Sequence, residues 1–181
     1  MKKIYTHIAM TLMAVFTMAA LTSCESDERI AYDLNGEWQG YMGESYYDYW
    51  GYENYAEYYT VMSFYRHGSS SYTYGATTGS GEQIDYINGN RYRPIYRRFT
   101  WEVDWNIIYI RYETGERAHI ANFDINGRYF TGKMRFYNRY GEEVGEANFD
   151  FRKATDFNWN QYYNWSQQPN ELVGDSIVVE K

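Results

Sequence analysis

The chain has 181 residues, a formal net charge of −7, and an aromatic content of 21% that includes 23 tyrosines and 6 tryptophans. The acidic balance argues against nucleic acid and anionic membrane surfaces as direct partners. Tyr, Phe and Trp favour strands, and only 2 prolines occur. The composition therefore predicts an all-β domain with aromatic side chains in its core and on its surface.

The first 23 residues are typical of a secretory signal peptide. Lys2 and Lys3 form a basic start, and residues 8–21 then run without a charge. That run is shorter than the roughly 20 residues that a membrane-spanning helix needs, and it has the length and flanks of a signal-peptide apolar region. We expect residues 1–23 to be removed, which leaves 158 residues with a formal charge of −9, enough for one domain.

The stretch Leu21-Thr22-Ser23-Cys24 resembles the lipobox of bacterial lipoprotein precursors, in which an apolar and two small residues precede a cysteine. The resemblance implies cleavage before Cys24 and lipidation of its thiol with acyl chains such as palmitate. Each buried CH₂ group would add about 0.8 kcal/mol to anchoring in the membrane. Residues 24–33 are expected to form an acidic tether. Within it, Glu25-Ser26-Asp27-Glu28 resembles the surface-export signal of Bacteroidetes lipoproteins, although acidic residues also suit a plain solvated tether.

Alternating apolar and polar side chains predict strands over residues 34–42 and 57–66. Residues 45–55 between them have no clean period and are rich in tyrosine, so we expect a loop there. Its rings could stack on a flat ligand or a sugar, or fold over the end of a barrel. Glycine and polar residues predict turns at 67–69, 79–81 and 88–90, with short strands over 71–76 and 83–87.

The second half of the chain predicts strands over residues 99–103, 107–112, 118–125, 130–137 and 144–152. Tight turns are expected between them, of which Asn126-Gly127 has the strongest hairpin signal. The other expected turns are Trp105-Asn106, Thr114-Gly115 and Tyr140-Gly141. Eight or nine short strands joined in this way predict an antiparallel up-and-down meander, and closing it into a barrel would remove its edges.

Residues 154–181 differ from the rest and are expected to form an aromatic extension and tail. Thr155 or Asp156 could cap a short helix with Trp159, Tyr162 and Tyr163 on one side, packed on the barrel wall. Asp175-Ser176-Ile177 resembles an O-glycosylation sequon of Bacteroidetes envelope proteins.

The whole pattern resembles the small lipocalin-like lipoproteins of Bacteroidetes, and the resemblance implies a calycin-type barrel over residues 34–153. It also implies an outer-membrane location, periplasmic or surface-exposed, but no particular activity, since such barrels bind many ligands. The stretches that carry the resemblance are Leu34-Asn35-Gly36-Glu37-Trp38-Gln39-Gly40, residues 79–86, Phe99-Thr100-Trp101-Glu102-Val103, residues 107–112 and Tyr129-Phe130-Thr131-Gly132.

Residues with catalytic or metal-binding potential are sparse, and we expect no enzyme, no metal and no cofactor. His67 and His119 lack metal-ligand spacing. Glu102 and Asp104 would lie roughly 7 Å apart on one strand face, as in inverting glycosidases, but that face is expected to meet solvent. The cluster of basic residues could bind a phosphate or a carboxylate, yet we interpret it as neutralising nearby acids on a solvated surface. Its members are Arg91, Arg93, Arg97 and Arg98.

The sequence thus predicts a non-catalytic envelope lipoprotein that binds a small or extended ligand through its barrel or its aromatic rim. The alternative is a structural or assembly accessory that contacts another envelope protein through the tyrosine-rich loop and the aromatic tail. A hollow aromatic interior would favour the first, and a filled interior with an exposed aromatic patch the second. The candidate ligand-contacting residues are Trp38, Tyr49, Trp50, Tyr52, Tyr58 and Trp101.

Overall fold

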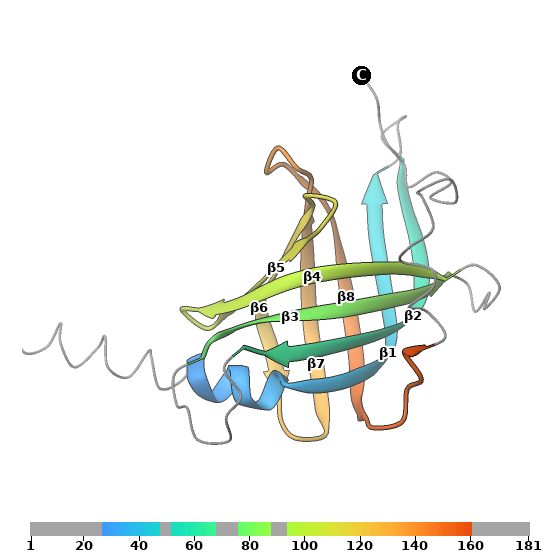
Figure 1. The fold of residues 1–181 in the computed structure, drawn as a ribbon. Coiled ribbons are helices and arrows are strands. Elements are labelled where there is room, and N and C mark those ends of the chain that lie inside the picture. The colour runs from blue at the N-terminus through green and yellow to red at the C-terminus, as the bar shows by residue number, and fades with distance from the viewer. Residues whose placement is uncertain (1–26, 48–51, 68–75, 88–93, 161–181) are drawn as a thin grey trace, which may run out of the picture.

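A computed structural model describes residues 27–47, 52–67, 76–87 and 94–160. Eight antiparallel strands pair in sequence order, and the last pairs with the first, so that the sheet closes into a barrel (Figure 1). The predicted up-and-down meander that closes into a barrel is therefore confirmed. The strands are β1 (Gly36–Tyr47), β2 (Glu53–Arg66), β3 (Thr78–Ile87), β4 (Ile95–Asp104), β5 (Ile107–Tyr112), β6 (Arg117–Ile125), β7 (Tyr129–Tyr137) and β8 (Glu143–Ala154).

The two ends of the barrel differ. A short helix over residues 27–34 lies at the end that also carries the β4–β5 and β6–β7 turns (Figure 1). We call this the closed end. The β5–β6 and β7–β8 turns lie at the opposite end, which we call the mouth.

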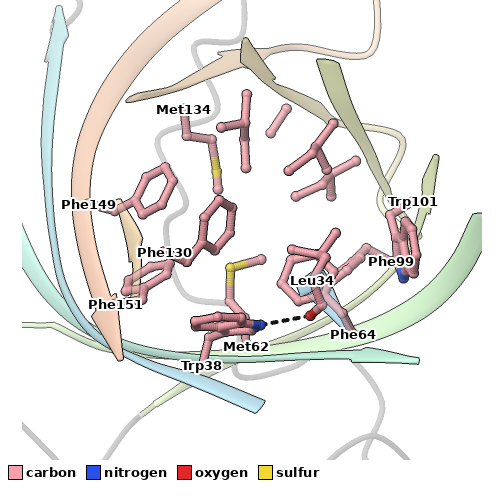
Figure 2. Packing of buried hydrophobic residues seen from close by; sticks show 14 of the residues in the cluster. Leu34, Trp38, Met62, Phe64, Phe99, Trp101, Phe130, Met134, Phe149 and Phe151 are labelled. Carbon is pink, nitrogen blue, oxygen red and sulfur yellow. Dashed lines mark hydrogen bonds between the residues drawn. The ribbon is translucent and has the colours of Figure 1, made fainter. Parts of the chain in front are cut away.

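Alternate side chains of each strand point inward, as the period of a strand requires. Toward the closed end they form a packed aromatic core (Figure 2). The ring of Phe130 lies 5.5 Å from that of Trp38 and 4.8 Å from that of Phe149, in edge-to-face arrangements that aromatic pairs prefer. The ring of Phe64 lies 5.2 Å from that of Phe99. This half of the interior is filled by side chains.

The helix corrects one prediction. The expected tether over residues 24–33 is wrong for 27–33, because these residues are helical and Ile30, Ala31 and Leu34 are buried in the core. Ile30 and Leu34 are four residues apart and share one helix face, which the barrel end covers. The carbonyl of Leu34 accepts a 2.7 Å hydrogen bond from the indole nitrogen of Trp38 (Figure 2).

The first residue described, Asp27, ties the helix to the barrel. Its carboxylate accepts hydrogen bonds from the backbone nitrogens of Trp105, at 3.1 Å, and Asn106, at 2.8 Å. These two residues form the β4–β5 turn, and their φ angles are 52° and 58°. The turn was predicted at this position, whereas its contact with the helix was not.

Two further predictions about turns and loops are corrected, the first of them at glycines. The predicted turn at 79–81 is wrong, because β3 runs through it from Thr78. A Cβ atom at Gly79 would lie 2.4 Å from the ring of Trp101, and one at Gly81 would lie 2.3 Å from the ring of Phe99. Both glycines are therefore needed as space for the aromatic core. The predicted loop over 45–55 is also too long, since β1 ends at Tyr47 and β2 begins at Glu53.

A third glycine allows close strand approach. A Cβ atom at Gly40 in β1 would lie 2.0 Å from the backbone oxygen of Asp150 in β8. Because backbone atoms give way less than side-chain ends, we expect Gly40→Ala to reduce the free energy of unfolding by about 1–3 kcal/mol, as overpacking does. Urea denaturation measures this loss. The control is Gly127→Ala, whose new Cβ would meet nothing within 4 Å; equal losses in the two variants would contradict the explanation.

The chain after β8 returns along the outer wall, as predicted. Trp159 packs with Val61, Ile84 and Tyr86 on the outer face of β2 and β3. Its indole nitrogen donates a 2.7 Å hydrogen bond to the carboxylate of Glu37. The predicted start of a helix at Thr155 or Asp156 is wrong, because residues 155–159 are not helical. Tyr162 and Tyr163 of that predicted helix lie outside the described residues, as do the predicted strand residues 71–75 and the tail with Ser176.

Candidate functional site at the barrel mouth

On the side formed by β1 to β4, the inward-facing side chains change from apolar to polar toward the mouth. At the change lies Asp85 of β3, whose side chain points inward and is fully buried. Its carboxylate accepts hydrogen bonds from Thr60 Oγ1, at 2.7 Å, and from the amide nitrogen of Gln83, at 2.9 and 2.8 Å. The Tyr112 hydroxyl in turn donates to the amide oxygen of Gln83, at 2.7 Å.

Arg97 of β4 completes this network by forming an ion pair with Asp85. Its guanidinium also lies 4.9 Å from the centre of the Tyr112 ring, a cation–π distance. Burial alone would lower the pKa of Arg97, but the adjacent carboxylate of Asp85 outweighs burial and raises it. Burial likewise raises the pKa of Tyr112, so its hydroxyl stays protonated and can donate. One nitrogen of the guanidinium, Nε, is buried and has no hydrogen-bond partner among the residues that the structure describes.

The basic cluster that the sequence suggested is therefore split. Arg98 lies on the outer wall, where its Nε donates to the Tyr96 hydroxyl at 3.0 Å and lies 3.8 Å from Glu82. This agrees with the predicted neutralisation of nearby acids at the surface. For Arg97 that prediction is wrong, because its side chain points inward. Arg91 and Arg93 lie outside the described residues.

Glu44 and Tyr58 lie above this network, nearer the mouth. Glu44 of β1 pairs with Ala56 of β2, and its side chain points inward like those of Trp38 and Met42. Burial raises the pKa of Glu44, while a hydrogen bond from the Tyr58 hydroxyl lowers it, and the balance is a raised value. Burial and the adjacent Glu44 carboxylate raise the pKa of Tyr58 as well. We call Glu44, Tyr58, Asp85, Arg97 and Tyr112 the mouth cluster.

The candidate ligand residues fall into three groups. Tyr58 belongs to the mouth cluster, and Tyr52, which directly precedes β2, is 71% exposed at the rim. Trp38 and Trp101 are only 0% and 2% exposed in the packed core, away from the mouth. Tyr49 and Trp50 lie outside the described residues. Glu44 and Arg97 were not among the candidate ligand-contacting residues. Their inward orientation could have been inferred from the alternation of apolar and polar side chains around them.

Two of the hollows among the described residues lie on the outer wall. One of about 550 Å³ crosses β2 to β5 and includes Tyr65, Arg98 and Arg111. A smaller one of about 230 Å³ lies beside His119, whose ring is 4.8 Å from that of Tyr109 and 4.5 Å from that of Tyr137. Burial, together with the charge of Arg117, lowers the pKa of His119 and keeps it neutral.

The possible acid pair of the sequence lies on the outer wall of the barrel. Glu102 and Asp104 are both exposed on the outer face of β4, as the sequence predicted. Within the described ranges, no three His, Cys, Asp or Glu side chains come together as a metal site. No helix in those ranges is both long and apolar enough to cross a membrane.

Comparisons with known proteins find similar solved structures. No family model and no curated protein matches the chain. One similar solved structure is a protein of unknown function from the DUF3598 family of Nostoc punctiforme, with a TM-score of 0.40 and 15% identity over 68% of this chain and 48% of that one. Another is a de novo designed fluorescence-activating β-barrel, with a TM-score of 0.40 and 16% identity over 68% of this chain and 96% of that one. This chain thus spans about half the length of the DUF3598 structure.

Proposed function

We propose that this protein is a non-catalytic envelope lipoprotein, anchored through Cys24, that binds a small or extended ligand at the barrel mouth. The observation that carries the proposal is the placement of Glu44, an acid held in a partly desolvated position near the mouth of an otherwise well-packed barrel. A buried carboxyl without a full ionic partner lowers stability. Groups that a fold retains at such a cost are found preferentially at functional sites.

The chemistry of the mouth favours a ligand with hydroxyl or amine groups, such as a glycan, over a fatty acyl chain. A long apolar chain would need an empty apolar channel, whereas the interior toward the closed end is filled by aromatic rings. The mouth offers the carboxylate of Glu44 and the hydroxyl of Tyr58 as hydrogen-bonding groups. Tyr52, exposed at the rim, adds an aromatic face for stacking.

We expect Glu44→Gln to stabilise the free protein at neutral pH. Because the folded-state pKa of Glu44 is raised, its contribution to stability is fully present below its ordinary value of 4.5 and is lost as pH rises through the raised value. The amide of Gln has no charge to desolvate, so the urea midpoint of Glu44→Gln should exceed that of the wild type at pH 7. The difference should shrink toward pH 4, and a variant less stable at both pH values would contradict this account.

The binding test is a thermal-shift screen of the protein against glycans, fatty acids and haem-like molecules. A ligand at a hundred times its Kd should stabilise the fold by about 2.7 kcal/mol. We expect a concentration-dependent shift with the glycan class, and we expect Glu44→Gln and Tyr58→Phe to reduce it. The control is Glu57→Gln, an exposed acid on the same strand as Tyr58. A flat screen against all classes would refute ligand binding.

The second candidate is a protein partner, which is favoured by two observations: the closed half of the interior is filled, and exposed tyrosines gather on β1 and β2. Tyr41 and Tyr55 are 61% and 68% exposed, and the ring of Tyr41 lies 5.4 Å from that of Tyr59 on the neighbouring strand. Aromatic residues of this kind are enriched at protein interfaces. The aromatic tail was also expected to contact such a partner. Trp159 does not support that role, because it packs on the wall of its own barrel. Chemical cross-linking tests this candidate. It is supported if the wild-type protein is cross-linked to a partner that the double variant Tyr41→Ser/Tyr55→Ser no longer captures.

A further inference from the structure

The β4–β5 turn at the closed end places a large apolar side chain where the backbone favours Asn or Gly. Trp105 has a φ of 52°, and its side chain is 68% exposed. Asp104 and Ile107 pair directly, so Trp105 and Asn106 are the two central residues of the hairpin. Two-residue turns with positive φ at both positions strongly prefer Asn-Gly or Asp-Gly. Neither local conformation nor burial therefore explains a tryptophan here.

The turn lies beside the point at which the chain enters the barrel. The carboxylate of Asp27 binds the backbone nitrogens of Trp105 and Asn106, at 3.1 and 2.8 Å. Asp27 follows Cys24 by three residues in the sequence, and three residues reach at most about 11 Å. A lipid on Cys24 would consequently hold the closed end, and with it Trp105, close to the membrane surface.

Other side chains at this end suit the same surface. Tyr32 on the helix is 69% exposed and lies 5.8 Å below the guanidinium of Arg66. Tyr129, at the start of β7, is 47% exposed, and the guanidinium of Arg152 lies 5.8 Å from its ring. Tryptophan and tyrosine prefer the headgroup region of a bilayer, and arginine can reach the phosphates there.

We propose that the Trp105 turn inserts into the lipid headgroup region beside the anchor and orients the barrel with its closed end on the membrane and its mouth facing away. Exposed tyrosines occur at the mouth too, for example Tyr140 at 80% exposure, so aromatic exposure alone does not choose the end. The contact between Asp27 and the Trp105 turn identifies the closed end as the end beside the anchor. This inference rests on the lipid anchor of the proposed function but not on its ligand.

The test uses the full-length lipidated protein in phosphatidylcholine vesicles that contain nitroxide-labelled lipid. Cys24 is the only cysteine, and lipidation occupies its thiol, so an introduced cysteine is the one free site for a fluorophore. The label is placed at Asp104→Cys, beside the turn, or at Tyr140→Cys, in the β7–β8 turn at the mouth. We expect the lipid nitroxide to quench the label at position 104 several-fold more than the label at position 140.

Trp105→Asn is the decisive variant, because Asn suits a positive φ and should leave the thermal unfolding temperature unchanged or higher. In this background we expect the difference in quenching between the two labels to fall substantially. Equal quenching at both ends, or a difference that Trp105→Asn does not change, would overturn the inference while leaving the anchor intact. Mass spectrometry that finds no acyl chain on Cys24 would overturn both the anchor and this inference, whereas the ligand screen is independent of either result.

Discussion

Asp85→Asn should reduce the free energy of unfolding by about 3 kcal/mol, the lower end of the range for removing one partner of a buried ion pair. The variant keeps the shape of the side chain and leaves Arg97 inside the barrel without its counter-charge. Asp85 is fully buried, whereas the side chain of Arg97 is 25% exposed and can gain some hydration, which is why the lower end applies. Urea denaturation at pH 7 measures the loss.

A double-mutant cycle separates the ion pair from the rest of the network. Arg97→Met fills similar space without a charge, so Asp85→Asn should cost much less in the Arg97→Met background than in the wild type. Glu146→Gln is the surface control. Its carboxylate lies 2.5 Å from Lys133 Nζ, with both side chains about 40% exposed, and such pairs contribute roughly 0.2–1 kcal/mol. If Asp85→Asn costs no more than Glu146→Gln, the mouth cluster does not depend on its ion pair.

The strands and most turns of this protein could be predicted from the sequence, because each is a local signal. The side chains of Phe99, Trp101 and Val103 alternate with polar ones, and all three are buried in β4. The turn at Trp105-Asn106 was evident from the change of phase that follows it. Local periodicity was thus enough for the order of the strands, since all pairs except the closing pair of β1 and β8 join consecutive strands.

What could not be predicted depends on neighbours distant in the chain. Gly79 and Gly81 looked like a turn, because a sequence does not show that the rings of Trp101 and Phe99 cover them. The partner of Arg97 is 12 positions away, and only the register between β3 and β4 brings it to Asp85. For Arg97 itself a signal existed, since it has the same phase as Phe99 and Trp101.

The N-terminal helix was missed because its apolar face is small and lies within an acidic run. Ile30, Ala31 and Leu34 are its only residues in the core. Their burial depends on the open end of a barrel that the rest of the chain builds. A segment this short would not be a stable helix alone, and its acidic composition indicated weak local structure. Composition could not indicate that the end of the barrel would cover its apolar face.

Because it fills the closed end, Leu34 should contribute more to stability than its position at the edge of the fold suggests. We expect Leu34→Ala to reduce the free energy of unfolding by about 2–5 kcal/mol, the range for truncating a buried leucine. Leu34 is 0% exposed and packs in the core that includes Trp38 and Phe64. Its backbone carbonyl would still accept the hydrogen bond from Trp38, so the loss reports side-chain packing alone.

Arg29→Ala is the matched control, because Arg29 lies on the same helix and is exposed. Both substitutions introduce the residue with the highest helix propensity, so helix formation itself cannot explain a difference between them. We expect Arg29→Ala to change stability by less than about 0.5 kcal/mol. If Leu34→Ala reduced the free energy of unfolding as little as Arg29→Ala, the helix would not be part of the folded core. The contact between Asp27 and the Trp105 turn would then not hold the N-terminal segment at the closed end. A large difference would show that the segment next to Cys24 folds as part of the barrel, which is the condition for an anchor there to orient the mouth.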